Sequence, residues 1–420
     1  MALYGTVILP GDKSISHRAI MLACLTEGPS VLHNVNRGAD VKQTVAVLKR
    51  CGMDIQWQDD TVTVQGAGRR PFLQPHLPLD CGNSGTTVRL AMGLVAGYPL
   101  QVTFTGDDSL SQRPMSRIIV PLRQMGARIS TRNQGYLPVM LTGGELWGIQ
   151  YDLPIPSAQV KSAIILAALN AQTETSVTSP LPSRDHTERM LKHLGAPITM
   201  EGNTITVKPL KKSLKHADYT IPGDISGGAF LIAAALLVPD SEVLLQGVSL
   251  NPTRTAFLEV VKAMGAQVKV TKISEVAGEP VGDILSQSSQ LHGITIPSDQ
   301  IPNLQDELPL IALLATQAEG ETAVSGAEEL KVKESDRIEA IVTNLQRWGA
   351  DIQAKPDGFV VRGFTPLTGG RVHTHHDHRI AMMMSVGGLV AREPERLDDK
   401  DCMAVSFPGF LTILDKLQHD

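Results

Sequence analysis

The sequence has few aromatic residues: Phe, Trp and Tyr together make up 4% of its 420 residues. Stacking on nucleic-acid bases needs such rings, so their scarcity disfavours a nucleic-acid-binding protein. The chain also lacks an excess of positive charge, since its net charge is −5 at pH 7. No overall basic field exists to attract nucleic acid or anionic lipid, and any basic site must be local.

Cysteine and long apolar runs are scarce as well. The four cysteines form no CxxC pair and show no regular spacing, which indicates reduced thiols rather than a disulfide framework. The longest apolar run, 229–238, is far shorter than the roughly 20 residues of a membrane span. The first residues contain no basic segment followed by an apolar run, as a secretory signal would. We therefore expect a cytoplasmic protein.

What the sequence does contain is a repeat. The phrase Leu-x-x-x-Gly-Ala-x-Ile/Val recurs with small variations. Each copy is typical of a helix end, a glycine that stops the helix, and a strand that enters a hairpin. The copies are LKRCGMDI (48–55), LRQMGARI (122–129), LKHLGAPI (191–198), VKAMGAQV (261–268) and LQRWGADI (345–352).

A second phrase alternates with the first: a small or polar cap, a helix rich in Ala and Leu, then a strand. These helices are hydrophobic on nearly all sides, so we expect them to be buried. Together the phrases predict six α/β units of about 70 residues, packed within globular domains. The copies of the second phrase are 12–25, 82–97, 157–169, 224–238, 306–315 and 377–391.

Most of these helices begin with a polar cluster. Free N–H groups and the helix dipole favour anions at helix N-termini, where Arg adds a planar fork and Lys a point charge. Gly85 would let backbone N–H groups approach an anion closely. Each cluster alone is typical of a helix cap, but several together would form a positive cleft for small phosphorylated anions. The clusters are Gly11–Arg18, Asn83–Arg89, Ser157–Lys161, Ser183–Glu188, Lys333–Arg337 and His376–Arg379, with Arg113 in a loop.

Other motifs favour neither a metal nor a nucleotide site. The histidines at 373, 375, 376 and 378 lack a second ligand group and an HExxH pattern, so we expect no metal. The sequence has no GxxxxGK[ST] loop and no GxSxG elbow. Gly227 and Gly228 indicate close helix packing rather than a dinucleotide-binding loop.

Carboxylates for proton transfer occur at two places. Asp306 and Glu307 begin one of the buried helices, and Glu334 lies between Lys333 and Arg337. A carboxylate beside Lys and Arg stays ionised, which suits a general base. On these residues alone the alternative, that Asp306 only caps its helix, stays open.

These motifs together resemble the 5-enolpyruvylshikimate-3-phosphate (EPSP) synthase family, in family order over residues 9–382. The resemblance implies an α/β (α+β) fold of two similar domains. Each would hold three βαβαββ units around a pseudo-threefold axis, an inside-out α/β barrel of the enolpyruvyl transferase type. The motifs are LPGDKSISHRA, CGNSGTTVRL, QRPM, SAQVKSA, SRDHTERML, PGDISGGAF, KVKESDRIEA and DHRIAM.

The resemblance also implies where the domains divide. The chain is expected to cross between them near Gly11 and near Gly223. One domain would then hold 12–222, with most contacts to shikimate 3-phosphate. The other would hold 1–11 plus 223–420, with the catalytic carboxylates. The active site is expected in the cleft between them.

The implied reaction is that of a 3-phosphoshikimate 1-carboxyvinyltransferase (EC 2.5.1.19), in the shikimate pathway to chorismate and the aromatic amino acids. The 5-hydroxyl of shikimate 3-phosphate attacks C2 of phosphoenolpyruvate while C3 is protonated. A tetrahedral intermediate then loses phosphate. The resemblance implies no metal and no organic cofactor, and the family precedent is a monomer.

Site residues carry over position by position. The resemblance implies Asp306 as the base for the 5-hydroxyl, and Glu334 and Lys13 as proton-transfer partners. The implied shikimate 3-phosphate site is Lys13, Ser14, Arg18, Ser157, Ala158, Gln159, Ser183, Asp306 and Lys333. The implied phosphoenolpyruvate site is Lys13, Gly85, Arg113, Gln159, Arg337 and Arg379.

Four positions depart from many relatives and affect fine contacts rather than the reaction. Ala158 stands where many have Ser, and His186 stands where some have Tyr. Glu329 stands where some have Asn, and Val405 where some have a phosphoenolpyruvate-binding Lys. Gly85 is the position at which Ala obstructs the herbicide glyphosate in insensitive members, so we expect this chain to bind it.

Two other functions stay open on the sequence. The sister transferase that acts on UDP-N-acetylglucosamine shares the fold but usually carries Cys in the loop before its Arg-Pro, and the loop 107–114 has none. The other is a non-catalytic anion-binding protein, against which the presence of Asp306, Glu334 and Lys13 argues. Phosphate release from shikimate 3-phosphate and phosphoenolpyruvate would separate an enzyme from a binding protein.

Overall fold

The structure is a computed structural model and describes residues 1–69, 72–132 and 135–419. The chain divides into two compact units, each with a hydrophobic core of its own. We call Gly11–Ile221 with Glu275–Glu279 the N-terminal unit. The C-terminal unit consists of Met1–Pro10, Pro222–Ser274 and Pro280–Asp420.

The N-terminal unit is covered by sheets of four strands with one shared pattern. Their orders are β13–β2–β4–β3, β5–β6–β8–β7 and β9–β10–β12–β11. In each, the first two strands are parallel and the last three alternate as antiparallel neighbours. The strands are β2 (Glu27–His33), β3 (Asp54–Gln58), β4 (Thr61–Ala67), β5 (Leu79–Asp80), β6 (Gln101–Thr105), β7 (Arg128–Thr131), β8 (Val139–Thr142), β9 (Gln150–Asp152), β10 (Thr175–Thr178), β11 (Ile198–Glu201), β12 (Thr204–Val207) and β13 (Asp218–Thr220).

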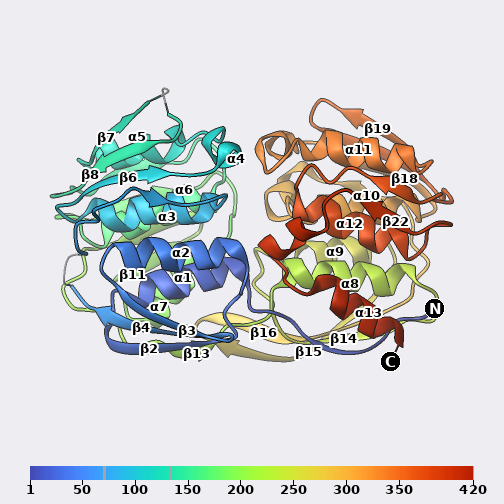
Figure 1. Cartoon of the computed structure of the whole chain (residues 1–420), viewed down its shortest axis with the longest axis horizontal. Helices are drawn as coiled ribbons and strands as arrows, with labels where there is room; N and C mark the ends of the chain where they lie inside the picture. Colours follow the sequence, from blue (N-terminus) through green and yellow to red (C-terminus); the bar gives the residue numbers. More distant parts are fainter. Residues whose placement is uncertain (70–71, 133–134, 420) are drawn as a thin grey trace. The chain divides into compact units, whose positions relative to one another are not determined.

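The interior of this unit is built from α1 (Lys13–Ala23), α3 (Gly85–Ala96) and α6 (Ala158–Ala168). Nearly all their side chains are buried, so the prediction of buried helices is confirmed here. The remaining helices of the unit are α2 (Ala39–Arg50), α4 (Asp108–Ser111), α5 (Ser116–Gln124) and α7 (His186–His193) (Figure 1).

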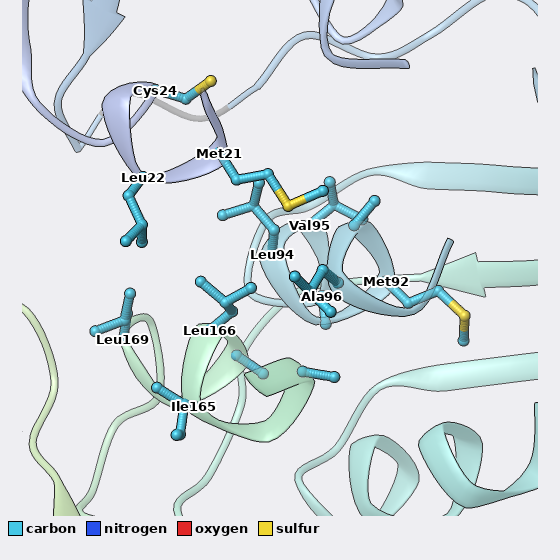
Figure 2. Close-up of a cluster of buried hydrophobic side chains, with 14 of the residues drawn as sticks. Met21, Leu22, Cys24, Met92, Leu94, Val95, Ala96, Ile165, Leu166 and Leu169 are labelled. Atoms are coloured by element: carbon cyan, nitrogen blue, oxygen red, sulfur yellow. The ribbon is translucent and has the colours of Figure 1, made fainter. Parts of the chain in front are cut away.

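The interior helices pack without space between α3 and α6. Figure 2 shows Met21, Leu94 and Leu166, from α1, α3 and α6, within one apolar cluster. At Gly93 of α3, a Cβ atom would lie 2.2 Å from the Ala163 carbonyl oxygen of α6. Only glycine permits so close a backbone approach.

The C-terminal unit repeats the pattern. Its sheets have the orders β1–β14–β16–β15, β17–β18–β20–β19 and β21–β22, so the last copy keeps only the parallel pair. The strands are β1 (Tyr4–Ile8), β14 (Glu242–Ser249), β15 (Gln267–Val276), β16 (Glu279–Gln287), β17 (Thr295–Ile296), β18 (Gly320–Val324), β19 (Asp351–Lys355), β20 (Gly358–Gly363), β21 (Gly370–Val372) and β22 (Glu395–Leu397).

Its buried helices are α8 (Ile225–Leu237), α10 (Leu308–Thr316) and α12 (His378–Gly388), again as predicted. A Cβ at Gly228 would lie 2.8 Å from Leu9 Cδ1, which confirms close helix packing there. The other helices are α9 (Ala256–Ala263), α11 (Arg337–Arg347), α13 (Phe410–His419) and the 3₁₀ helices η1 (Ser298–Asn303), η2 (Glu328–Val332) and η3 (Asp401–Val405).

The five copies of the first phrase all form the predicted helix end and strand. They join α2 to β3, α5 to β7, α7 to β11, α9 to β15 and α11 to β19. The glycine of each copy has a positive φ, from 81° at Gly195 to 112° at Gly126, as a helix-terminating glycine requires. Across the part of the chain that the structure describes, no helix is both long and apolar enough to cross a membrane.

Candidate active site

The first turn of α1 carries two predicted site residues, Lys13 and Ser14. Asp12 is the N-cap, and its Oδ1 accepts a hydrogen bond from the Ile15 N–H at 2.9 Å. Lys13 Nζ lies 3.1 Å from Asp40 Oδ2 of α2, and 17% of the Lys13 side chain is exposed. Ser14 is half-buried beside it. The helix start therefore presents a lysine and a hydroxyl at the positive end of the helix dipole.

Arg18, one turn further along α1, is a buried cation that joins several elements. Its Nη1 donates to the Ser14 carbonyl at 2.9 Å, its Nε to Thr187 Oγ1 at 2.8 Å, and its Nη2 to Ser162 Oγ at 3.1 Å. Burial lowers the pKa of Arg18 to about 10, partly offset by the carboxylate of Glu188, so the guanidinium stays protonated at neutral pH. Arg18 thus links α1, α6 and α7.

The segment before α7 meets α6 at Lys161. Lys161 Nζ lies 2.7 Å from Glu188 Oε1, and the two side chains are 4% and 0% exposed. The same ammonium donates to the Ser183 carbonyl at 3.3 Å. Ser183 is itself 8% exposed, and its Oγ has no hydrogen-bond partner among the residues that the structure describes.

The start of α3 lies beside two guanidinium groups. Ser84 caps the helix, and its Oγ accepts from the Thr87 N–H at 3.1 Å. A Cβ at Gly85 would lie 2.8 Å from Arg89 Nη1 and 3.7 Å from Arg113 Nη1. Free backbone N–H groups and two cations at one helix start favour an anion.

Arg113, in the loop between α4 and α5, is held in place by its neighbours. Its Nη2 donates to Asn83 Oδ1 at 2.7 Å and to Ser109 Oγ at 3.1 Å. Asn83 directly precedes the N-cap of α3, and Ser109 lies within α4. Arg113 is 9% exposed, and its guanidinium reaches the start of α3 at Gly85.

Gln159 connects α6 to α3. Its Oε1 accepts from Arg89 Nη1 at 2.6 Å, and its Nε2 donates to Thr86 Oγ1 at 3.0 Å. Ser157 is the N-cap of α6, and Ala158, half-buried, is its first residue. The starts of α3 and α6 are therefore tied together by side chains of the predicted site.

A buried chain of hydrogen bonds connects α1, α2 and α3. His17 Nδ1 lies 2.7 Å from Thr44 Oγ1, which lies 2.7 Å from Thr87 Oγ1. Burial, followed by the charges of Lys13 and Arg18, lowers the pKa of His17 well below its ordinary value. The imidazole is thus neutral at physiological pH and adds no charge to the site.

In the C-terminal unit, Arg337 at the start of α11 faces three carboxylates. Its Nε donates to Asp377 Oδ2 at 2.8 Å and its Nη2 to Glu334 Oε2 at 2.7 Å, while Nη1 lies 3.4 Å from Asp306 Oδ1. Burial alone would lower the pKa of Arg337, but Asp377, Glu334 and Asp306 outweigh it and raise the pKa. The arginine is a permanent cation between two predicted catalytic carboxylates.

Arg379, in the first turn of α12, lies on the other side of Asp306. Its Nη2 is 3.8 Å from Asp306 Oδ2, and its Nη1 donates to the Ser226 carbonyl at 3.2 Å. The guanidinium also stands 5.8 Å from the centre of the Phe230 ring. Its buried Nε has no hydrogen-bond partner within the described residues, which leaves a donor for a ligand.

Asp306 does not cap α10, which was the alternative role left open by the sequence. The N-cap of α10 is Glu307, and no side-chain cap hydrogen bond is made there. Glu307 instead accepts a hydrogen bond from Ser226 Oγ, which also receives one from Arg254. Burial raises the pKa of Glu307, with a smaller contribution from Asp306 in the same direction. Asp306, 16% exposed, is left to face the two arginines.

The positions that depart from many relatives are not equivalent. His186 is buried, and its Nδ1 lies 2.7 Å from Glu279 Oε1, in the turn between β15 and β16 that belongs to the N-terminal unit. Glu329 lies in η2, and this helix ends directly before the half-buried Lys333. Val405 is the half-buried last residue of η3.

Two of the histidines near α12 contact carboxylates. His373 pairs with Asp398, and His376 Nδ1 lies 2.6 Å from Asp399 Oδ2. No group of three or more His, Cys, Asp or Glu side chains suited to a metal occurs within the described ranges.

The predicted site residues thus form two groups, one in each unit. Sequence reasoning missed the partners of several buried charged residues. These partners are Asp377 for Arg337, Glu188 for Lys161 and Arg254 near Glu307. Asp377 lies inside the DHRIAM motif, but nothing in the sequence shows which arginine it pairs with. The first group is Lys13, Ser14, Arg18, Gly85, Arg113, Ser157, Ala158, Gln159 and Ser183, and the second is Asp306, Lys333, Glu334, Arg337 and Arg379.

Comparison with known proteins decides the family. A family model described as EPSP synthase (3-phosphoshikimate 1-carboxyvinyltransferase) matches residues 1–414. The chain belongs to the EPSP synthase family. A 3-phosphoshikimate 1-carboxyvinyltransferase of Brevibacillus brevis is 48% identical over 416 residues, covering 99% of this chain and 97% of the relative. One from Oceanobacillus iheyensis is 46% identical over 417 residues, with the same coverage.

Solved structures agree with this EPSP synthase assignment. An EPSP synthase from Acinetobacter baumannii has a TM-score of 0.89 and 41% identity, covering 99% of this chain and 96% of that one. The enolpyruvyl transferase NikO from Streptomyces tendae has a TM-score of 0.76 at 17% identity, covering 99% and 95%, and shows the shared fold alone. The predicted enolpyruvyl transferase fold and the resemblance to the EPSP synthase family are confirmed, and the UDP-N-acetylglucosamine alternative is not favoured.

Proposed function

We propose that the two groups of site residues act on one pair of substrates, shikimate 3-phosphate and phosphoenolpyruvate. The reaction follows from membership in the EPSP synthase family. The enzyme transfers the enolpyruvyl group of phosphoenolpyruvate to the 5-hydroxyl of shikimate 3-phosphate and releases phosphate. The assignment of residues to each substrate, below, is our proposal.

Shikimate 3-phosphate is held mainly by the N-terminal unit. Ser14, Ser157 and Ser183 supply hydroxyls near the starts of α1, α6 and α7, and Arg18 supplies a buried positive charge. The open Ser183 Oγ supports this role, because a buried hydroxyl without a partner is costly unless a ligand pairs with it. The remaining proposed contacts to this substrate are Lys13, Ala158, Gln159, Asp306 and Lys333.

Phosphoenolpyruvate is held by charges from both units. In the N-terminal unit, Gly85 and Arg113 lie side by side at the start of α3. In the C-terminal unit, Arg379 keeps an unpaired Nε and Arg337 stands next to it across Asp306. A planar guanidinium suits both the carboxylate and the phosphate of this substrate. Lys13 and Gln159 complete the proposed contacts.

Three residues transfer protons in the proposed mechanism. Asp306 takes the proton of the 5-hydroxyl as its oxygen bonds to C2, and Glu334 gives a proton to C3. In the second step Glu334 takes a proton back from C3, the C2–C3 double bond re-forms, and the C2–O bond to phosphate breaks. Lys13 assists departure of the phosphate by donating to its oxygen.

One observation carries this proposal: Asp306 lies between two arginines, one of which also holds Glu334. The arrangement places the two proposed proton-transfer carboxylates beside one arginine, within reach of a shared substrate. The test is phosphate release from shikimate 3-phosphate plus phosphoenolpyruvate, monitored by a coupled assay. Release with both substrates together is expected. Folded protein that releases none would favour a non-catalytic anion-binding protein, and release with UDP-N-acetylglucosamine instead would favour the sister transferase.

We further propose that glyphosate competes with phosphoenolpyruvate beside Gly85. A Cβ at this position would come within 2.8 Å of Arg89 Nη1, so Ala would force that guanidinium to shift. Gly85→Ala should therefore raise the inhibition constant of glyphosate roughly tenfold or more, in the range that one misplaced methyl group gives. Undiminished activity of the unaltered enzyme at saturating glyphosate and low phosphoenolpyruvate would contradict the proposal.

We also propose that the enzyme works as a monomer in the cytoplasm. Light scattering coupled to gel filtration at assay concentrations should return a mass near 45.1 kDa. A stable dimer would contradict the first part, and recovery of the enzyme outside the cytoplasmic fraction of its own cells would contradict the second.

A further inference from the structure

The ion pair of Lys161 and Glu188 is buried in the N-terminal unit, and the proposed mechanism does not use it. The two charged atoms are 2.7 Å apart, and both side chains are almost fully enclosed. The contact is ionic rather than a well-aligned hydrogen bond, because neither Glu188 oxygen has a hydrogen-bond partner of good geometry among the described residues. Taking two charges out of water costs free energy that a buried pair often does not recover. Stability alone is therefore a weak reason for it.

The surroundings of the pair point to the substrate half-site. Lys161 and Ser162 are neighbours on α6, and Thr187 and Glu188 are neighbours on α7. Ser162 Oγ lies 2.7 Å from Thr187 Oγ1, and both hydroxyls contact Arg18. The ion pair thus runs alongside the bridge that fixes Arg18.

Lys161 extends this connection to the segment that precedes α7. Its ammonium donates to the Ser183 carbonyl at 3.3 Å. Fixing that carbonyl restricts the backbone of Ser183 and hence the direction of its side chain. The Ser183 Oγ is buried, and no other described residue hydrogen-bonds to it. The backbone oxygen is therefore engaged while the hydroxyl stays available.

We propose that Lys161, held by Glu188, is a positioning residue that orients Ser183 for shikimate 3-phosphate. This inference rests on the proposed role of Ser183 in binding that substrate. Lys161 does not touch the substrate; it removes the need to order the Ser183 segment when the substrate binds. Such pre-organisation appears as affinity for one substrate and not as a faster chemical step.

The central test is Lys161→Met, which keeps an unbranched side chain close to the length of Lys but removes the charge and the donor. We expect the dissociation constant and the KM for shikimate 3-phosphate to rise about tenfold, the effect of one hydrogen bond of ordinary strength. The KM for phosphoenolpyruvate and kcat should change less than about twofold. Lys161→Arg should recover part of the affinity, because a guanidinium can reach both partners.

Lys208→Met is the matched control. Lys208 forms an ion pair with Glu174 in the same unit, at 3.8 Å, but the two side chains are 70% and 51% exposed. Its substitution should leave both KM values unchanged. If Lys161→Met and Lys208→Met behave alike, the proposal is wrong.

A double variant separates positioning from charge balance. Lys161→Met together with Glu188→Met removes both buried charges, so neither is left unpaired and the fold is protected. If Lys161 acts through Ser183, affinity for shikimate 3-phosphate stays low in the double variant. If affinity returns, Lys161 only neutralises Glu188, and the inference fails even though the family reaction stands.

Ser183→Ala tells apart the failure of this inference and the failure of the role given to Ser183. If that role is right, Ser183→Ala weakens shikimate 3-phosphate binding, and adding Lys161→Met to it has little further effect. If Ser183→Ala leaves binding unchanged, the proposed role of Ser183 is wrong, and the inference about Lys161 is wrong with it. If Ser183→Ala weakens binding but Lys161→Met does not, only the inference falls.

Discussion

The two units place different charged groups on one scaffold. In both, buried apolar helices begin with polar residues, and sheets of the same strand order cover them. In the N-terminal unit, the central cation Arg18 donates to hydroxyls and a carbonyl. In the C-terminal unit, the central cation Arg337 faces three carboxylates. In our proposal the helix starts favour anions in both units, and the side chains beside them determine whether a start serves binding or proton transfer.

Charge balance differs in the same way. In the N-terminal unit Lys13 pairs with Asp40, and Lys161 pairs with Glu188. The C-terminal unit shares Asp306 between Arg337 and Arg379. Shared pairs leave a carboxylate within reach of two cations, which is a suitable place for a base. Substitutions in the two units should therefore change different measured properties of the enzyme.

The largest effect is expected from Asp306→Asn. Removing the proposed base while keeping its shape should lower kcat by about 10²–10⁴-fold. Affinity for shikimate 3-phosphate, measured by calorimetric titration, should change little, because most proposed contacts lie in the other unit. The thermal unfolding midpoint serves as the control for the fold. Near-normal turnover would remove Asp306 from the mechanism.

Lys13→Met probes the N-terminal unit in the same assay. Loss of a charge that stabilises the departing phosphate should lower kcat by about 10²–10³-fold. Unlike Asp306→Asn, it should also weaken the binding of both substrates. Lys49→Met, an exposed lysine near the end of α2, is the control and should be silent. If Lys13→Met altered KM alone, Lys13 would be a binding residue only.

Stability should separate the two central arginines. Arg337→Met would leave the fully buried Asp377 without its main partner and should cost about 3–5 kcal/mol of unfolding free energy. Arg18→Met leaves Thr187 and Ser162 in contact with each other and should cost about 1–3 kcal/mol. Scanning calorimetry measures both. Equal losses would show that the carboxylate network does not distinguish the units.

The smallest expected effect is on the pH dependence of the unfolding free energy. Burial alone would raise the pKa of Asp398, but hydrogen bonds from Thr374 and the pair with His373 outweigh it, so the pKa is lowered. A lowered carboxyl pKa adds stability above its ordinary value of about 3.9 and loses it as the pH falls below that value. Asp398→Asn should therefore cost about 1–2 kcal/mol at pH 7 and less at pH 2.5.

Tryptophan fluorescence can assign this acid effect to one unit. Trp348 is fully buried in the C-terminal unit, whereas Trp57 and Trp147 belong to the N-terminal unit. With the latter two replaced by Phe, Trp348 alone reports on unfolding of the C-terminal unit. Urea unfolding of this background, with and without Asp398→Asn, gives the difference at each pH. A difference that does not shrink in acid would contradict the linkage.

The sequence was sufficient for the elements but not for the partners. Helices apolar on nearly all sides had to be interior, and Leu-x-x-x-Gly phrases had to end helices, because both follow from local rules. The pairing of Arg337 with Asp377, 40 residues away, depends on how α11 meets the start of α12. No local rule gives it. The same holds for Lys161 and Glu188.

Other misses arise from chain topology. The turn Glu275–Glu279 groups with the N-terminal unit although its strands lie in a sheet of the other, and Glu279 becomes the partner of His186. The sequence of a hairpin does not show which of the two units its turn packs with. Asp306 illustrates a further limit, because a carboxylate before a helix is usually a cap. Only the positions of two distant arginines show otherwise.

The contact at Gly93 has a consequence for catalysis far from the chemistry. Its missing side chain lets the backbones of α3 and α6 touch, more than one turn beyond the ends that carry Arg89 and Gln159. A methyl group there would act as a wedge, since its obstacle is main chain and cannot swing aside. The two helices would splay, and the hydrogen bonds across their first turns would stretch. The absence of one carbon atom deep in the apolar interior thus keeps the starts of α3 and α6 close enough for Arg89 to reach Gln159.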